Sequence, residues 1–238
     1  MKDYTCVDLE TTGIHPAYSK ITEIGMVKVR DGAVIATYSR LVNPGIAIPP
    51  EITRITGIDD AMVAGEPPLE AVLGEVLEFC GMDPLLGHNI LFDYGFLKTH
   101  LAQAGVPFER NGLDTLALAR RFGEGKGGKS LSALCDAYHI HRKQAHRALE
   151  DALATHTLYG ILRDRHFSQT TASYFVPRPL QYRPRKEQPI TDRQRRYLLA
   201  LLDRYPVRLS EPLEKMTKSE ASRQIDRILF EFGRNSKE

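Results

Sequence analysis

Cysteine is scarce in this sequence of 238 residues, which contains only Cys6, Cys80 and Cys135. Their number is odd, they lie far apart, and no two of them form a Cys-x-x-Cys pair. These features argue against a disulfide framework and against a zinc knuckle. We therefore expect three small, buried hydrophobic residues.

Long apolar runs are also missing, since no stretch approaches the roughly 18 apolar residues of a membrane span. The sequence leads from Met1 directly into a strand-like segment at Tyr4, without the apolar region of a secretory signal. We expect a cytoplasmic protein with no membrane partner. Polymerase motifs are absent too, so any role beside a polymerase is expected to be in trans.

The net charge of +2 is small, but it is unevenly distributed. Residues 1–176 contain 17 Lys and Arg against 21 Asp and Glu, whereas residues 177–238 contain 15 against 9. The C-terminal quarter is therefore a basic unit attached to a mildly acidic one.

Apolar patterning predicts an α/β fold with a mixed sheet flanked by helices, because strands come first and helices are interleaved afterwards. The predicted strands are 4–10, 23–30, 33–42, 85–87 and 113–114. The predicted helices are 69–80, 92–104, one ending near 121, 130–138, and a long one from 145 onward.

Three parts are expected along the chain. Residues 1–165 form the α/β domain, and the proline- and arginine-rich segment 166–189 is a stiff basic linker. Residues 190–238 form a small basic two-helix module. Capping boxes at Thr191-x-x-Gln194 and Thr217-x-x-Glu220 each precede an apolar helical pattern, which predicts the two helices.

Asp8 and Glu10 lie two positions apart on the first predicted strand, so both carboxylates face the same side. An acidic pair on a strand is more often a solvated face. Here the apolar neighbours Cys6, Val7 and Leu9 indicate a buried strand, where unpaired charges are costly. A pair of this kind predicts a bound cation.

Three further candidates lie near predicted helix starts. Asp93 begins one helix, and His146 and Asp151 begin the last one. Taken singly, an acid in a first helical turn is explained by the helix dipole, and the histidine by a surface position.

Together, these residues lie in three ordered segments that resemble the motifs of the DEDDh (DnaQ-like) 3′–5′ exonuclease family. The resemblance is greatest to the proofreading exonuclease subunits and domains of bacterial replicative polymerases of the DNA polymerase III type. It covers roughly residues 3–162 and implies a ribonuclease H-like fold. The matching segments are Asp8-Leu9-Glu10-Thr11-Thr12-Gly13, His88-Asn89-Ile90-Leu91-Phe92-Asp93 and His146-Arg147-Ala148-Leu149-Glu150-Asp151.

The resemblance implies a two-metal-ion nuclease using Mg²⁺ or Mn²⁺, hard cations that take carboxylate oxygens. Asp8 would bridge both ions, Glu10 and Asp151 would complete the site of the ion that activates water, and Asp93 would hold the second ion. His146 would be the general base, since the ordinary histidine pKa of about 6.5 leaves the ring mostly neutral near pH 7.

Contacts with a nucleotide are also implied. Thr11 or Thr12 would contact the terminal nucleotide, and Leu9, Phe92 and Phe96 would shape its pocket. Phenylalanines at positions i and i+4 of a helix are nevertheless more often ordinary core residues.

The C-terminal basic residues are expected to follow a phosphate backbone, with Tyr182 and Tyr197 available for stacking. The alternative is a solvated helical hairpin that docks on a protein. The basic residues concerned are Arg183, Arg185, Lys186, Arg193, Arg195 and Arg196.

Several functions stay open from the sequence. The first is a DNA exonuclease acting on single-stranded or frayed 3′ ends in repair or replication, alone or with a polymerase. The second is a 3′ exoribonuclease, because discrimination depends on how the sugar 2′ position is contacted. The third is a nucleic-acid-binding adaptor with a silent nuclease fold, which the presence of all five catalytic residue types disfavours. A sliding clamp is a further possible partner, because 169–175 faintly resembles a clamp-binding peptide.

Overall fold

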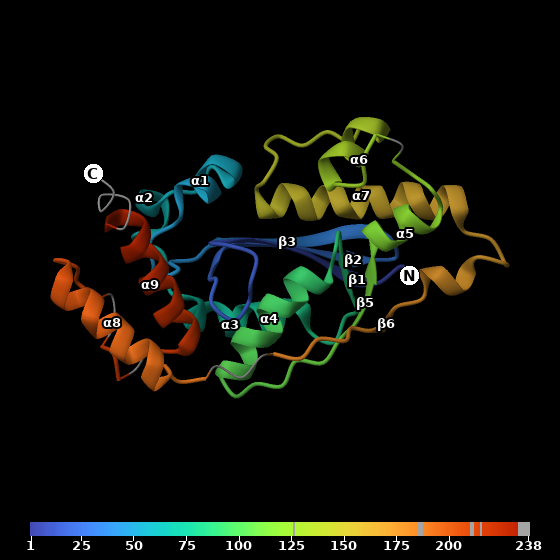
Figure 1. The fold of residues 1–238 in the computed structure, drawn as a ribbon. Coiled ribbons are helices and arrows are strands. Elements are labelled where there is room, and N and C mark those ends of the chain that lie inside the picture. The colour runs from blue at the N-terminus through green and yellow to red at the C-terminus, as the bar shows by residue number, and fades with distance from the viewer. Residues whose placement is uncertain (126, 185–187, 210–211, 215, 233–238) are drawn as a thin grey trace. The chain divides into compact units, whose positions relative to one another are not determined.

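The structure is a computed structural model that describes residues 1–125, 127–184, 188–209, 212–214 and 216–232. The chain divides into two compact units, Met1–Pro184 and Arg185–Glu238. Figure 1 shows their elements.

The first unit is built on a six-stranded mixed sheet with the strand order β3-β2-β1-β4-β5-β6. β2 is antiparallel to both β1 and β3, β4 runs parallel to both β1 and β5, and β6 is antiparallel to β5. This arrangement confirms the predicted α/β class with a mixed sheet. The strands are β1 (Tyr4–Thr11), β2 (Ile21–Arg30), β3 (Ala33–Leu41), β4 (Leu85–Gly87), β5 (Asn111–Asp114) and β6 (Arg178–Pro179).

Helices cover both faces of the sheet. Helices α3 and α4 lie on one side, and α5, α6 and α7 lie on the other (Figure 1). Short helices α1 and α2 follow β3, and a 3-10 helix, η1, follows α7. The bounds are α1 (Pro50–Thr56), α2 (Asp60–Val63), α3 (Leu69–Cys80), α4 (Leu91–Gln103), α5 (Thr115–Arg121), α6 (Leu131–Tyr138), α7 (Ala148–His166) and η1 (Ala172–Phe175).

Side chains of β1 alternate between the two cores. Val7 and Leu9 belong to the core that includes α3 and α4, whereas Cys6 belongs to the core that includes α5 and α7. Because alternate residues of a strand face the same side, Asp8 and Glu10 face the α7 side. The alternation of side chains along β1 therefore places the acidic pair on the face of the sheet that α7 covers.

The beginning of α7 packs directly on β2 at Gly25. A Cβ atom at this position would lie 2.1 Å from the carbonyl carbon of Ala148, a distance that no side chain tolerates. Gly25 is also the cross-strand partner of Asp8. The glycine thus lets the first turn of α7 approach the acidic pair of β1.

Two predicted helix starts differ from the structure. The helix predicted for 92–104 begins one residue earlier, at Leu91. Before it, Asn89 is left-handed with φ of 70°, and its main-chain carbonyl accepts the N–H of Phe92. The last helix begins at Ala148 rather than near Ala145, because His146 is also left-handed, with φ of 58°. A left-handed residue cannot continue a right-handed helix.

Much of the segment expected to be a linker, 166–189, belongs to the first unit, which extends to Pro184. Phe175 of η1 and Leu180 are buried, and β6 pairs with β5. Tyr182, expected to be available for stacking, packs against Gly95 of α4. The first compact unit therefore includes residues that the composition alone placed outside it.

The second unit contains α8 (Asp192–Arg204) and α9 (Lys218–Phe232). Both helices begin at the expected capping boxes: Thr191 pairs with Gln194, and Thr217 pairs with Glu220. The buried core of this unit consists of Ile190, Leu198, Leu201, Met216, Ala221, Ile225 and Ile228.

All three cysteines are buried and free, which confirms their expected role as small hydrophobic residues. Among the helices formed by the described residues, none combines the length and apolarity that crossing a bilayer requires.

Candidate active site

A cleft of about 220 Å³ lies at the C-terminal ends of β1 and β4. The structure brings all five predicted catalytic residues into it. Two come from β1, one from the first turn of α4, one from the loop before α7, and one from α7 itself. These residues are Asp8, Glu10, Asp93, His146 and Asp151.

Asp93 is held against the open edge of β1. β4 pairs with β1 only at Thr5 and Cys6, so the edge beyond Cys6 has no strand partner. There the N–H of Leu9 donates a hydrogen bond to Oδ1 of Asp93 at 2.9 Å, and the carboxyl group is buried. The Leu9 N–H has no strand partner on this edge, and it therefore binds and positions a carboxylate from α4.

Asp151 has a partner on each oxygen. Nη1 of Arg142 donates to Oδ1 at 2.8 Å, and the main-chain N–H of His146 donates to Oδ2 at 3.2 Å. Arg142 also donates to Oγ of Ser132 at 2.9 Å. These bonds fix the orientation of the Asp151 carboxylate, as supporting groups do around a functional site.

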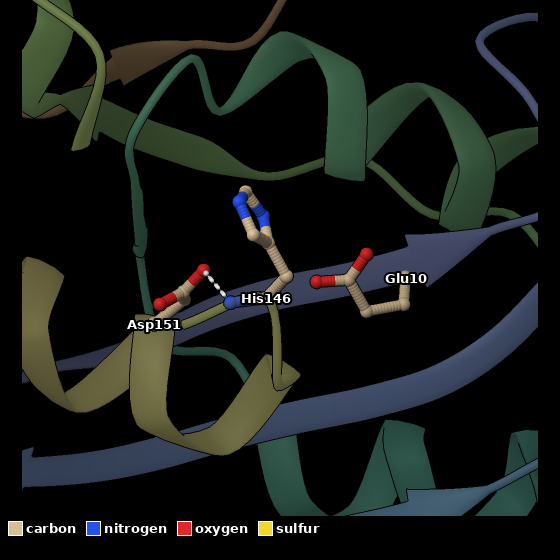
Figure 2. A group of neighbouring side chains, drawn as sticks. All are labelled: Glu10, His146 and Asp151. Atoms are coloured by element: carbon tan, nitrogen blue, oxygen red, sulfur yellow. Dashed lines mark hydrogen bonds between the residues drawn. The ribbon is translucent and has the colours of Figure 1, made fainter. Parts of the chain in front are cut away.

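The side chain of His146 is exposed and forms no hydrogen bond with another described residue. Ligand-type atoms of Glu10, His146 and Asp151 all lie within 4.8 Å of one another. Figure 2 shows these three side chains gathered around a common space, with the bond from the His146 N–H to Asp151. A cation or a water molecule would meet all three groups there.

The position of the loop before α7 depends on a buried ion pair. The Glu23 side chain, only 2% exposed, accepts hydrogen bonds from Nε and Nη2 of Arg147 at 2.7–3.1 Å. It also accepts the N–H of Ala148 at 2.9 Å. Glu23 on β2 is the cross-strand partner of Glu10 on β1. Because His146 directly precedes Arg147, the ion pair between Arg147 and Glu23 ties His146 to the neighbourhood of Glu10.

Negative charge in the cleft is only partly balanced. Burial, and then the charges of Asp93 and Asp151, raise the pKa of Asp8 well above its usual range. Burial likewise raises the pKa of Asp93, and burial with the charges of Asp151 and Glu23 raises the pKa of Glu10 to about 8. Of the described side chains that line the cleft, Arg142 alone carries a permanent positive charge. The four carboxylates form an oxygen donor set that suits hard divalent cations, and the single arginine leaves most of their charge unbalanced.

The residues predicted to contact a nucleotide differ in whether they line the cleft. Leu9 and Phe92 line the cleft. Phe96 does not: it is fully buried, with its ring centroid 5.0 Å from that of Phe92, which it supports from the core. The hydroxyl of Thr11 donates to the carbonyl of Gly13, and that of Thr12 accepts the N–H of Lys20, so both serve the turn after β1.

Sequence reasoning did not place Arg142, Glu23 and Arg147 at the site. A signal for Glu23 was present, because it is a single acid within the apolar pattern of β2. His88, the first residue of the second motif, has local hydrogen-bond partners: its ring nitrogens contact Oγ1 of Thr115 and the main-chain carbonyl of Lys129.

The predicted basic residues of the C-terminal part lie in different surroundings. Arg183 is exposed, Arg193 and Arg196 are exposed on α8, and Arg195 is half-buried there. Their contact with nucleic acid stays a prediction. Arg185 and Lys186 lie outside the described residues.

The segment expected to resemble a clamp-binding peptide, 169–175, ends in a buried aromatic residue. Phe175 packs against Phe122 and Tyr159 in the core of the first unit. In this conformation its ring is not accessible to a partner.

Comparisons with known proteins agree with the geometry. Residues 5–159 match the family model described as Exonuclease. The DNA polymerase III subunit epsilon of Aquifex aeolicus is 33% identical over 180 residues, which cover 75% of this chain and 89% of that protein. The PolC-type DNA polymerase III of Caldanaerobacter subterraneus subsp. tengcongensis is 36% identical over 157 residues, or 66% of this chain. The match covers only 11% of that much longer relative.

Among solved structures, exonuclease X in complex with 5′ overhanging duplex DNA has a TM-score of 0.57 and 28% identity. The similarity covers 70% of this chain and 95% of exonuclease X, which confirms the predicted ribonuclease H-like fold. The chain therefore belongs to the DnaQ-like exonuclease family, as its three motifs predicted.

Proposed function

We propose that the chain is a metal-dependent 3′–5′ exonuclease that hydrolyses DNA phosphodiester bonds from the 3′ end. The observation that carries this proposal is the meeting of Asp8, Glu10, Asp93, His146 and Asp151 in one cleft of a member of this family. Family membership indicates the class of reaction, and the five residues supply the groups that it needs.

Asp8, Glu10, Asp93 and Asp151 would hold two divalent cations, Mg²⁺ or Mn²⁺. Bound there, such cations activate the attacking water and neutralise the charges that develop on the phosphate and on the leaving 3′ oxygen. The raised pKa values of Asp8, Glu10 and Asp93 support this assignment, because burial, and then the neighbouring carboxylates, disfavour their ionised forms when no cation is bound.

His146 would act as the general base. Its imidazole is exposed, lies beside the carboxylates of Glu10 and Asp151, and is not engaged by another described residue. A neutral ring nitrogen in this position accepts a proton from a water molecule held in the cleft. Arg142 and the N–H of His146 keep Asp151 oriented meanwhile.

The substrate would be a single-stranded or frayed 3′ end. Leu9 and Phe92 line the cleft and offer apolar surface to the terminal nucleotide. DNA is favoured over RNA because exonuclease X was solved with a DNA duplex and because the epsilon relative is a DNA polymerase subunit. By the same similarity, the chain would proofread in trans beside a polymerase.

The test uses 5′-labelled single-stranded DNA and RNA of one sequence, incubated with the purified chain and Mg²⁺ or Mn²⁺. We expect a ladder that shortens from the 3′ end, faster on DNA, and that disappears with EDTA and in Asp8→Ala. Faster shortening of RNA would assign the RNA substrate instead. No shortening of either strand by a folded, metal-supplied chain would contradict the enzyme and leave a binding role.

The proofreading assignment has its own measurement. A primer annealed to a template should lose a mismatched 3′ nucleotide faster than a matched one, because the mismatched end frays into a single strand. Equal rates for the two primers would argue against editing.

A further inference from the structure

Helix α8 carries an exposed stripe that its own core does not use. Arg193, Arg196, Tyr197 and Arg204 are spaced at i, i+3, i+4 and i+11, which places them on one face of the helix. All four are exposed, the tyrosine by 47%. We call these four residues the α8 stripe. Leu198 and Leu201 lie on another face of α8 and are buried in the core of the second unit.

Two acids of α8 lie close to the stripe. Asp192 precedes Arg193 by one residue and Arg196 by four, and Asp203 precedes Arg204 by one. Among the described residues, Arg193, Arg196 and Arg204 form no ion pair. The guanidinium group of Arg204 lies over the ring of Tyr205, 5.4 Å from its centroid. The stripe therefore presents three guanidinium groups that no carboxylate of the described residues pairs with.

An aromatic ring lies within this positive surface. Tyr197 follows Arg196 directly and lies about one helical turn beyond Arg193. Surfaces that hold single strands combine cations, which follow the phosphates, with exposed aromatic rings, on which bases stack. A duplex keeps its bases stacked internally, so the exposed ring favours a single strand.

We propose that the α8 stripe binds single-stranded nucleic acid through its phosphate backbone and one stacked base. From Arg193 to Arg204 the helix rises about 16 Å, which spans up to about five nucleotides at 3.4 Å each. The three arginines, none of which forms an ion pair among the described residues, favour a negatively charged partner. The exposed ring of Tyr197 favours a single strand over a duplex. Arg195, expected from the sequence to belong to this surface, is half-buried and lies off the stripe.

The proposal is independent of hydrolysis in the cleft, because it rests on the second unit alone. If the proposed exonuclease activity holds, a strand bound by the stripe stays attached to the enzyme between cleavage events. Binding measured in EDTA requires no turnover. Loss of hydrolysis in every variant would therefore contradict the proposed function without bearing on the stripe.

The experiment measures the affinity of the full chain for labelled single-stranded DNA and RNA in EDTA over a range of salt concentrations. One triple variant, Arg193→Gln with Arg196→Gln and Arg204→Gln, removes the cations of the stripe. For three phosphate contacts with a single strand, the slope of log affinity against log salt should fall in magnitude by about 2. Comparing DNA with RNA shows whether the backbone alone is recognised.

A second triple variant is the matched control. Arg208→Gln, Lys218→Gln and Arg227→Gln remove the same charge from exposed positions of the same unit outside the stripe. This control should leave the slope nearly unchanged. Circular dichroism melts of both triple variants establish that the helices stay folded. Equal slopes for the two triple variants, or an acidic protein that binds the stripe while nucleic acid does not, would overturn the proposal.

The tyrosine is tested separately. Tyr197→Ala should weaken single-strand binding by about 5-fold or more, and Tyr197→Phe should restore it, because stacking uses the ring and not the hydroxyl. Duplex DNA of the same sequence should be bound equally by wild type and Tyr197→Ala. An equal loss on duplex and single strand would contradict the assignment to single strands.

Discussion

Arg142 donates from Nη1 to Oδ1 of Asp151 at 2.8 Å, and both side chains are only 8% exposed. The arginine comes from the loop before α7, and the aspartate from the first turn of that helix. A buried charge that keeps its partner is tolerated, whereas one that loses its partner is strongly destabilising. The stability of the fold should therefore depend on whether the Asp151 carboxylate has a positively charged partner, either Arg142 or a cation bound in the cleft.

Removing this arginine should destabilise the chain chiefly when no metal is present. Arg142→Gln should cost on the order of 3 kcal/mol in EDTA, because Asp151 loses its buried partner. A loss of that size lowers the melting temperature by roughly 6–12 °C for a protein of this length. Divalent cations should restore part of the loss. The control is Arg165→Gln, whose side chain is 55% exposed and lies 3.8 Å from Glu124, so that this pair contributes little. Equal melting shifts for the two variants would argue against the linkage.

Stability should depend on pH in an unusual direction. The pKa of Glu10 is raised to about 8 by burial and by the charges of Asp151 and Glu23. Between the ordinary glutamate pKa of about 4.3 and this value, the folded chain binds more protons than the unfolded chain. The free energy of unfolding of the metal-free chain should therefore fall as pH rises through that window.

Divalent cations should reverse this trend, so that the rise in melting temperature on adding Mn²⁺ is larger at pH 8 than at pH 6. Melting curves with Mn²⁺ and with EDTA at the two pH values provide the measurement. Glu10→Gln should flatten the decline in EDTA. A metal effect that shrinks as pH rises would be evidence against cations bound by these carboxylates.

One methyl group added at Gly25 should prevent the close approach of α7 to β2. Gly25→Ala would place Cβ 2.1 Å from the Ala148 carbonyl carbon, so α7 must move away from the sheet together with Asp151. We expect a destabilisation of at least about 1–3 kcal/mol, together with lost activity. Gly74→Ala is the matched control: it lies in α3 with nothing within 4 Å of the new atom and should be stabilising by about 0.5–1 kcal/mol. Chemical denaturation measures both.

The role of His146 can be separated from that of a metal ligand. His146→Gln should lower kcat by about 10²–10⁴-fold, the usual contribution of a general base, while Mn²⁺ affinity changes little. The control is the neighbouring exposed His141→Gln, which should leave both quantities unchanged. If Mn²⁺ affinity falls as steeply as kcat in His146→Gln, the ring is a ligand and not the base.

Local patterns were sufficient to predict much of the site. Alternation along the first strand placed Asp8 and Glu10 on one side, and the family resemblance of the three motifs implied which segments would meet. What the sequence did not indicate depends on side-chain contacts outside these patterns. One example is the pairing of Arg142 with Asp151, nine residues apart, and another is the fork of Arg147 on Glu23, between the loop before α7 and β2.

Backbone conformation was likewise out of reach. His146 looked like part of a helix because the apolar pattern continues around it, but its left-handed φ places it in the loop instead. The segment near Leu180 looked like a linker because proline and arginine dominate its composition. Pairing of β6 with β5, which no local pattern encodes, holds that segment in the first unit.

The account depends most on whether the four carboxylates hold divalent cations. Equilibrium dialysis of Mn²⁺ against the full chain at pH 8 tests this claim directly, with Asp8→Asn alongside. We predict two bound Mn²⁺ per wild-type chain and the loss of at least one in Asp8→Asn, because Asp8 lies among the other acids of the cleft. A folded wild-type chain that binds no Mn²⁺, or an Asp8→Asn variant that binds as many ions as wild type, would contradict it.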